Sequence, residues 1–437
     1  MTARRLLALL VVALLALLAV PGTARAHAHL IQADLAPDAD LLVPAGTVHF
    51  WFDEGLNGGL SKILIRDAQG VQVNTDTGHV DPTNSEELDV RVPALAPGQY
   101  TVFWTSDSSS DGHILHGFYL FTVGGTGARA ISTAPSAFVS TETPALDSTS
   151  LSSALAHWLV LLASTVWTGA LALELLILLP ARLRAGARVA EVTGRASARL
   201  RSVIGLGLVA TLLALLAELG TQAYAAAGWS GLTNGAVLGD ILSSHYGTYW
   251  IARMLLVVLI LLVVGAIPDY SPGALRARRA RLPARPMGLV LLAITGTLGL
   301  AYLLAFALSG HAAAVSQLVF TSVGLDWLHL LANSVWIGGM AAIALAIVPA
   351  LPAARSSGGR DAAAENLAVL DLLDRFSPLA YLALATAAVT GEFNAQVHLS
   401  SLDQLINSTY GRFLLIKLVL IGEIMALSAS HVFLTRP

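Results

Sequence analysis

Cysteine is absent from the 437 residues of this chain, and charge is scarce. Without cysteine the protein cannot form disulfides, Fe–S clusters or thiolate metal sites, so any soft-metal chemistry must use histidine, methionine or carboxylate. Charged residues make up 12% of the sequence and hydrophobic residues 55%, and this charged share is about half that of a soluble domain. These proportions exclude a single soluble enzyme.

Motifs of nucleotide chemistry are also lacking. The sequence contains no Walker motif, kinase loop or aspartyl-phosphate motif, so ATP-driven pumping has no support. It has no flavin-binding signature, and no catalytic triad, pair of catalytic carboxylates or nucleic-acid-binding motif stands out. We therefore expect a protein that is not an enzyme and that does not bind nucleic acid.

The net charge of −3 conceals an uneven distribution of charge along the chain. Residues 27–124 hold 13 Asp and Glu against 3 Lys and Arg, whereas the remainder holds 15 against 22. An acidic domain attracts cations through its field, although an acidic surface more often serves solubility. The sequence thus predicts an acidic domain joined to a domain with basic edges.

The first 26 residues have the three parts of a secretory signal peptide. Arg4 and Arg5 form the charged start, residues 6–20 the apolar stretch, and Ala24-Arg25-Ala26 the cleavage signal. Cleavage there would begin the mature chain at His27. The alternative is an uncleaved membrane anchor, for which 15 apolar residues are short. In both cases we expect the domain that begins at His27 to lie outside the cytoplasm.

Residues 27–124 are predicted to form a small all-β domain. Short segments rich in β-branched and aromatic residues alternate with Pro, Gly and Asp, a pattern typical of a sandwich or barrel. These segments are 47–52, 60–66, 88–92, 99–105 and 117–123. Residues 125–150, rich in Ser, Thr, Ala, Gly and Pro, are expected to be a linker.

Residues 151–437 are predicted to form an all-α membrane domain with about seven helices. The apolar segments, each long enough to cross a bilayer, are 152–179, 202–226, 249–267, 287–308, 325–349, 377–397 and 413–434. With the β domain outside, arginines cluster in every loop that is then cytoplasmic, as the positive-inside rule requires. These are Arg182, Arg184, Arg188, Arg195, Arg199, Arg201, Arg276, Arg278, Arg279, Arg281, Arg285, Arg355, Arg360 and Arg375. The C-terminus should be cytoplasmic.

The membrane domain contains an internal repeat. Residues 158–171 align with residues 327–340 at 8 identities in 14, and residues 244–253 align with residues 408–417. The first predicted helix therefore corresponds to the fifth and the third to the seventh, in a parallel repeat of four-helix units. The partner of the fourth helix would fall after Pro437, so the chain either has seven spans or has lost an eighth.

Four residues at the two ends of the β domain have the chemistry of a copper site. A free amine on His27 would offer two nitrogen donors from one residue, with His29 nearby. Asp111 and His113 are two apart, which places both on one side of an extended strand. Nitrogen and oxygen donors suit Cu(II), the divalent ion that such sites bind most tightly. Alternatively, Asp-Gly-His is a polar turn.

Polar residues in the membrane domain are candidates for function because they are costly there. His157 begins the first predicted helix, His311 follows the fourth, and Asp326, His329 and Asn333 share one face of the fifth. We expect these residues to converge on the outer half of the bilayer as a metal or relay site. The alternative is capping at the membrane interface.

Other polar and aromatic residues are given more ordinary roles. Glu423, near the middle of the seventh predicted helix, is a candidate for a proton or ion relay, or it pairs with a neighbouring helix. His49 and His79 are expected on the surface of the β domain. The repeat tryptophans are expected to pack the bundle or anchor it at the interface, and they are Trp158, Trp167, Trp327 and Trp336.

The residues of the two domains resemble two known copper families. The start His27-Ala-His-Leu, residues 97–104, and Asp111-Gly-His113 leading into residues 117–123 are similar to the periplasmic protein CopC. The His, Trp and Gly repeats of the helices, with Gly310-His311, are similar to the inner-membrane protein CopD. The chain thus resembles a CopC–CopD fusion over nearly its whole mature length.

This resemblance implies a cupredoxin-like or immunoglobulin-like Greek-key barrel that binds Cu(II) through His27, Asp111 and His113. His29 could instead bind copper through an amine-plus-amide site. The five methionines, Met1, Met254, Met287, Met340 and Met425, all lie outside residues 27–124. The methionine-rich Cu(I) site of some CopC proteins is therefore absent, and we expect only Cu(II) in the outer domain.

The resemblance also implies a function in copper handling at the bacterial inner membrane. The outer domain would capture Cu(II) from periplasmic or extracellular donors and pass it to the membrane domain, for import or for resistance, with a cytoplasmic copper chaperone as a further partner. Whether Cu(I) or Cu(II) enters the membrane domain stays open. Two alternatives remain, namely a haem-binding electron-transfer protein and a copper sensor or chaperone without transport.

Overall fold

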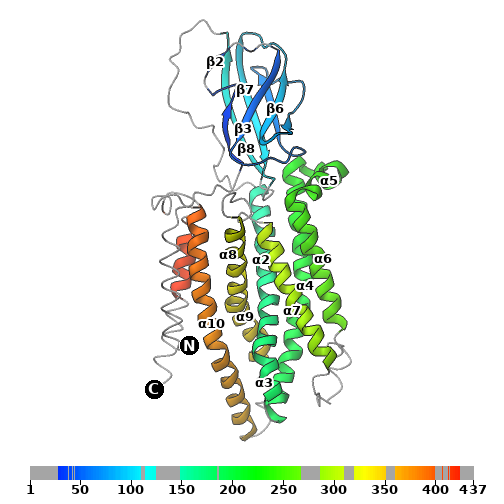
Figure 1. Ribbon diagram of the computed structural model, residues 1–437, viewed down its shortest axis with the longest axis vertical. Coiled ribbons are helices and arrows are strands. Elements are labelled where there is room, and N and C mark those ends of the chain that lie inside the picture. Colours follow the sequence, from blue (N-terminus) through cyan, green and yellow to red (C-terminus); the bar gives the residue numbers. More distant parts are fainter. Residues whose placement is uncertain are drawn as a thin grey trace.

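The structure is a computed structural model of the chain. It describes residues 28–37, 39–41, 43, 45–109, 114–124, 148–184, 187–266, 286–309, 319–350, 360–398, 406, 412 and 414–423. The predicted signal peptide and most of the predicted linker lie outside these residues, as do His27, Asp111, His113 and His311. Within the described part, a β domain sits at one end of a long bundle of helices (Figure 1).

The β domain of residues 28–124, here named the outer domain because it lies beyond one end of the helix bundle, is a sandwich of two sheets, each of four strands. Its strands are β1 (Leu30–Ala33), β2 (Asp40–Leu41), β3 (Gly46–Phe52), β4 (Lys62–Asp67), β5 (His79–Asp81), β6 (Asn84–Val92), β7 (Gly98–Asp107) and β8 (Ile114–Val123). The first sheet has the order β1-β3-β6-β5 and the second the order β2-β8-β7-β4. The all-β prediction and its five segments are confirmed. The additional strands have only two to four residues, too few for an alternating pattern to mark them.

The core of the sandwich follows from the alternation along its strands. On β3, Val48, Phe50 and Phe52 are buried while the residues between them are more exposed, because successive side chains of a strand point to opposite faces. Trp104 is buried on β7, directly opposite Gly117 on β8. A Cβ atom at Gly117 would lie 2.4 Å from the indole, so only glycine leaves room for this ring.

Among the described residues, six helices are long and apolar enough to cross a membrane. The α-helical segments are α2 (Ser148–Leu173), α3 (Leu179–Arg184), α4 (Ala187–Ala227), α5 (Gly235–Ser243), α6 (His245–Ala266), α7 (Pro286–Leu308), α8 (Val319–Asn333), α9 (Gly339–Ala342) and α10 (Arg360–His398). The first six predicted spans are thus helical, and α2 begins three residues before the predicted domain start. Residues 414–423 of the seventh are helical as well.

The internal repeat is visible in the backbone. The first span contains a π-helical segment at Glu174–Leu178, and the fifth contains two, at Ser334–Gly338 and Ile343–Ile347. Glu174–Leu178 and Ile343–Ile347 are 169 residues apart, the same offset that separates Trp158 from its repeat partner. Two copies of one sequence pattern therefore distort their helices at the same position.

The two repeats also pack against each other through matching glycines. A Cβ atom on Gly169 would lie 2.3 Å from the backbone of Gly338, and one on Gly338 would lie 2.0 Å from the backbone of Thr165. The neighbouring Trp167 and Trp336 are buried, which confirms their packing role. Small residues let two membrane helices approach closely, so the Trp-x-Gly pattern marks the contact between the repeats.

Candidate metal centre

The start of the outer domain is fixed to the ends of two strands. Ala28 is fully buried, and its carbonyl oxygen accepts a hydrogen bond of 2.6 Å from Oγ of Ser106 on β7. The amide of His29 donates to Oδ1 of Asp53 at 2.6 Å, and the amide of Asp53 donates to the His29 carbonyl at 3.0 Å. Ala28 is therefore held beside the end of β7.

Strand β7 ends and strand β8 begins at this same end of the sandwich. Asp107 closes β7 and pairs with Ile114, the first residue of β8. Ser108 donates to the buried Glu54 carboxylate at 2.8 Å and so holds the start of the connection. The described residues that flank the predicted ligands His27, Asp111 and His113 thus lie together in space.

This end of the sandwich faces the helix bundle. A small cavity lies between the two domains, with room for about one water molecule. Leu60, Asp107 and Ile114 line it from the outer domain. The bundle residues are Gln222, Ile241, Ser244 and Tyr246. Leu60 also packs against the apolar core of the bundle. In Figure 1 the sandwich rests beside α5 and the first turns of α2.

Just below this contact, three charged or titratable residues form a cluster. His157 on α2 bonds Glu218 on α4, with 2.8 Å between Nδ1 and Oε1. The other carboxylate oxygen of Glu218 lies 3.3 Å from Nη2 of Arg253 on α6. Glu218 is 4% exposed and Arg253 1%, so the two charges must neutralise each other. We name these three residues the α2–α4–α6 cluster.

The guanidinium of Arg253 is also held by aromatic rings. It lies 5.0 Å from the ring centre of Phe306 on α7 and 5.8 Å from that of Tyr246. The ring of His157 lies 5.5 Å from that of Phe306. Cation–π contacts of this kind are strongest where water is excluded. The cluster therefore ties four helices together directly beneath the outer domain.

A second polar cluster joins α8 to α10. Nδ1 of His329 lies 2.9 Å from Oγ1 of Thr390, and Oδ1 of Asp326 accepts from Nδ2 of Asn394 at 3.0 Å. A Cβ atom at Gly391 would lie 3.0 Å from the His329 ring, so a glycine makes room for the imidazole. Asp326 is the repeat partner of His157, 169 residues later.

The described membrane residues do not converge on one metal site as expected. His157 bonds α4 while His329 bonds α10, and neither belongs to a group of three ligand atoms within the described part of the chain. Nδ1 of each ring bonds a polar side chain in the same repeat unit. Glu423 is exposed in the described segment of its helix.

Two groupings were missed by the sequence analysis. Glu218 and Arg253 form an ion pair that a lone arginine inside an apolar segment could have indicated. His49, Glu87 and Asp89 are the one group of three potential metal ligands within the described residues, where only surface roles were expected for the histidine. Burial lowers the pKa of His49, but the hydrogen bond to Asp89 and the nearby carboxylates outweigh it and raise this pKa above 6.5.

Two family models match parts of the chain. The CopC domain model matches residues 30–124, and the model described as "Copper resistance protein D", CopD, matches residues 370–437. The copper transport protein CutJ of Bacillus subtilis is 27% identical over 428 residues. That alignment covers 98% of this chain and 71% of CutJ.

Two solved structures are similar to the outer domain. CopC from Methylosinus trichosporium OB3b is 32% identical, with a TM-score of 0.21, over 22% of this chain and 93% of that one. The methionine-rich copper resistance protein PcoC from Escherichia coli is 25% identical, with a TM-score of 0.19, over 22% and 99%. From the family matches and its spans, the chain is a multi-pass membrane protein that combines a CopC domain and a CopD domain in one polypeptide.

Proposed function

We propose that this protein captures Cu(II) outside the cytoplasm with its CopC domain and passes it to the helix bundle, for copper import and homeostasis. One observation carries the proposal: the described residues that flank His27, Asp111 and His113 meet at the end of the sandwich that faces the bundle. A site built there would release its ion next to the membrane domain. The acidic outer domain would raise the local concentration of cations.

In this proposal His27, Asp111 and His113 are the Cu(II) ligands of the outer domain. Nitrogen and carboxylate donors fit Cu(II). The alternative site at His29 would need the amide nitrogen of that residue as a ligand, but this amide donates to Asp53 at 2.6 Å. Breaking that bond would cost free energy, so the structure supports His27 over His29 as the first ligand.

The transfer route would run from the outer site to the α2–α4–α6 cluster. Asp107 and Ile114 line the cavity that Gln222 and Tyr246 share. Gln222 lies one turn beyond Glu218 on α4, and the ring of Tyr246 contacts Arg253. The side chain of His157 is 50% exposed and already bonds a carboxylate, so it would be the first imidazole that an incoming ion meets.

Further steps would use the polar residues of the second repeat. Asp326 and His329, with His311, are candidates for the next site, and Glu423 for an ion or proton relay. Since no ATP-driven motif is present, transport would be passive or coupled to the membrane potential or to protons. In this proposal the outer domain lies in the periplasm or outside the cell and the C-terminus in the cytoplasm, which the arginine-rich loops support.

The haem and sensor alternatives make different demands on the same residues. Haem ligation by His157 and His329 would use Nε2 of both rings, because Nδ1 of His157 bonds Glu218 and Nδ1 of His329 bonds Thr390. It would also require both rings to face one haem from opposite sides. A copper sensor or chaperone would use the same ligands without moving the ion through the bundle. The metal bound by the purified protein therefore separates copper binding from haem binding. Movement of copper across a membrane separates a transporter from a sensor or chaperone.

The test uses the full chain in detergent, with N-terminal sequencing to establish the start at His27. Cu(II) binding is measured in the protein and in His113→Ala and His157→Ala variants, with His398→Ala, at the end of α10, as a control histidine. We expect His113→Ala to remove the tightest Cu(II) equivalent. We expect His157→Ala to keep this binding but to slow copper entry into reconstituted vesicles.

Two results would overturn the proposal. Co-purified haem, with Cu(II) binding that ignores His113→Ala, would make the bundle an electron carrier. Tight Cu(II) binding without copper entry into vesicles under any potential or pH gradient would make the protein a sensor or chaperone.

A further inference from the structure

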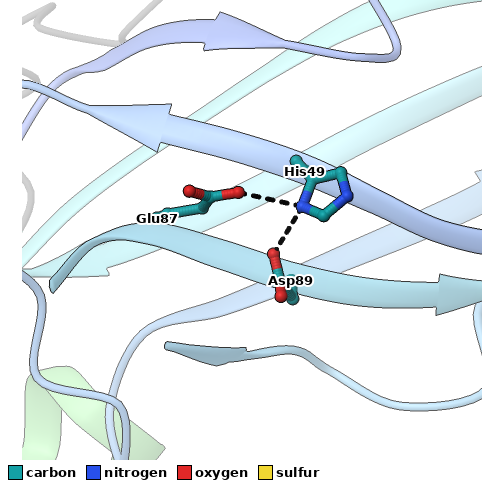
Figure 2. A group of neighbouring side chains, drawn as sticks. All are labelled: His49, Glu87 and Asp89. Carbon is teal, nitrogen blue, oxygen red and sulfur yellow. Dashed lines mark hydrogen bonds and ion pairs between the residues drawn. The ribbon is translucent and has the colours of Figure 1, made fainter. Parts of the chain in front are cut away.

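The outward face of the first sheet carries a group of metal-ligating side chains far from the candidate copper site. Figure 2 shows His49 on β3 reaching toward Glu87 and Asp89 on β6. Nδ1 of His49 lies 2.7 Å from Oδ1 of Asp89 and 2.9 Å from Oε1 of Glu87. The opposite face of these strands is the core, where Phe50, Leu88 and Val90 are fully buried. The group therefore lies on a rigid surface.

The strand register adds a second histidine to this group. His49 pairs directly with Asp89, and Asp89 pairs in turn with His79 on β5. Directly opposite residues of antiparallel strands lie on the same face, with Cβ atoms about 5 Å apart. Three neighbouring strands thus present His49, Asp89 and His79 in one row, with Glu87 beside it.

The donor set has the composition of a transition-metal site. Ligand atoms of His49, Glu87 and Asp89 all lie within 4.8 Å of one another, close enough for one ion to contact all three. Imidazole and carboxylate suit Cu(II) and Zn(II), whereas Mg(II) and Ca(II) prefer oxygen alone. The side chains of Glu87 and Asp89 are 17% and 13% exposed, so an ion there would be partly shielded from water.

We propose that His49, Glu87 and Asp89, with His79 as a fourth ligand, form a second metal site of the outer domain for a divalent transition-metal ion, with Cu(II) bound most tightly. The site goes beyond the proposed function and is independent of it. The outer domain would then bind two ions, one at the end that faces the bundle and one on the outward face of the first sheet.

The test measures Cu(II) binding to the full chain in which His113→Ala has removed the first site. Into this protein we introduce His49→Asn, Asp89→Asn or His79→Asn, each of which preserves side-chain size closely. The control is His245→Asn, a histidine of the bundle. Binding is followed by metal titration and by the nitrogen couplings in the electron paramagnetic resonance spectrum of bound Cu(II).

We expect His49→Asn and Asp89→Asn each to weaken one Cu(II) equivalent at least tenfold, and His79→Asn to weaken it less. The spectrum should lose a nitrogen coupling in both histidine variants and keep it in the control. Equal Cu(II) stoichiometry and affinity in the His49→Asn and Asp89→Asn proteins would overturn the proposal. Such a result would leave the first site untouched, since that site is tested by His113→Ala alone.

Discussion

Arg253 shows at the scale of single residues how the bundle tolerates a charge. Its guanidinium is 1% exposed in an otherwise apolar helix, and Glu218 supplies the opposing charge. A buried ion pair is weak evidence of added stability, but removal of one partner leaves an unpaired charge. We therefore expect removal of one charge to destabilise the bundle more than removal of both.

Glu218→Gln should destabilise the bundle by about 3–5 kcal/mol, because Arg253 then stays buried without a counter-charge. Arg253→Met in the same protein should recover most of the loss. The measurement is SDS-induced unfolding in mixed micelles for both single variants and the double variant. Additive losses in the double variant would show that the two charges do not depend on each other.

Asp81 provides a pH-dependent contribution to the turn between β5 and β6. Its carboxylate accepts from the amide and hydroxyl of Thr83 and from the amide of Asn84. The hydrogen bonds from Thr83 hold the pKa of Asp81 below its usual 3.8. A lowered pKa means that the stabilisation is present above pH 3.8 and is lost as the pH falls through the folded-state value.

Asp81→Ala should therefore speed amide hydrogen exchange of residues 79–84 at pH 7. The difference between the two proteins should shrink as the pH is lowered below 3.8, because the wild-type carboxylate is then protonated. Mass-spectrometric exchange at matched intrinsic rates measures this. A difference that persists unchanged at the lowest pH would point to side-chain size instead of charge.

At the scale of elements, the contact between repeats depends on small residues. Gly169 and Gly338 allow the first and fifth spans to approach until their backbones touch. The same Trp-x-Gly pattern occurs in both copies, so one motif provides both sides of one interface. Helices in a bilayer associate through such close packing instead of the hydrophobic effect.

Gly169→Ala should cost about 1–3 kcal/mol, since its Cβ would lie 2.3 Å from the backbone of Gly338 and the helices would have to separate. Gly205→Ala on α4 is the matched control, because its Cβ would meet nothing within 4 Å. SDS-induced unfolding compares the two proteins. Equal stability of both variants would mean that the first and fifth spans are less closely packed than described.

At the scale of the whole molecule, the outer domain is docked on the bundle. The loop with Leu60 packs against the bundle core, and Gly59 lies against Asp240 on α5. A domain held only by a flexible linker would sample many positions. This contact instead keeps the candidate copper site close to the α2–α4–α6 cluster, which favours direct transfer.

Gly59→Trp should separate the two domains, because even a Cβ atom there would lie 2.6 Å from Cγ of Asp240. We expect Cu(II) affinity of the outer domain to be unchanged and copper entry into vesicles to fall by on the order of tenfold as the effective concentration drops. Gly46→Trp, at a position with nothing within 4 Å, is the control. Unchanged entry in the Gly59 variant would argue against transfer through this contact.

Features that depend on composition and local period can be predicted from the amino-acid sequence alone. The absence of cysteine from the chain and of methionine from residues 27–124 restricts side-chain metal ligands in the outer domain to nitrogen and oxygen. Apolar segments of span length predict the helices, and alternation predicts the main strands. The repeat was also visible as a match between residues 158–171 and 327–340. Each of these features depends on residues close together in the sequence or on the similarity of two segments, so it can be recognised without the folded structure.

Which polar residues contact each other can be seen only in the folded chain. His49 and Asp89 are 40 residues apart, and His157 and Glu218 are 61 apart. Strand register and helix packing bring them together, and both are fixed by the burial of apolar faces over the whole domain. The pattern of residues along the chain predicts the face of a helix or strand on which a side chain lies. The residue that this side chain contacts on a neighbouring element depends on how the two elements pack.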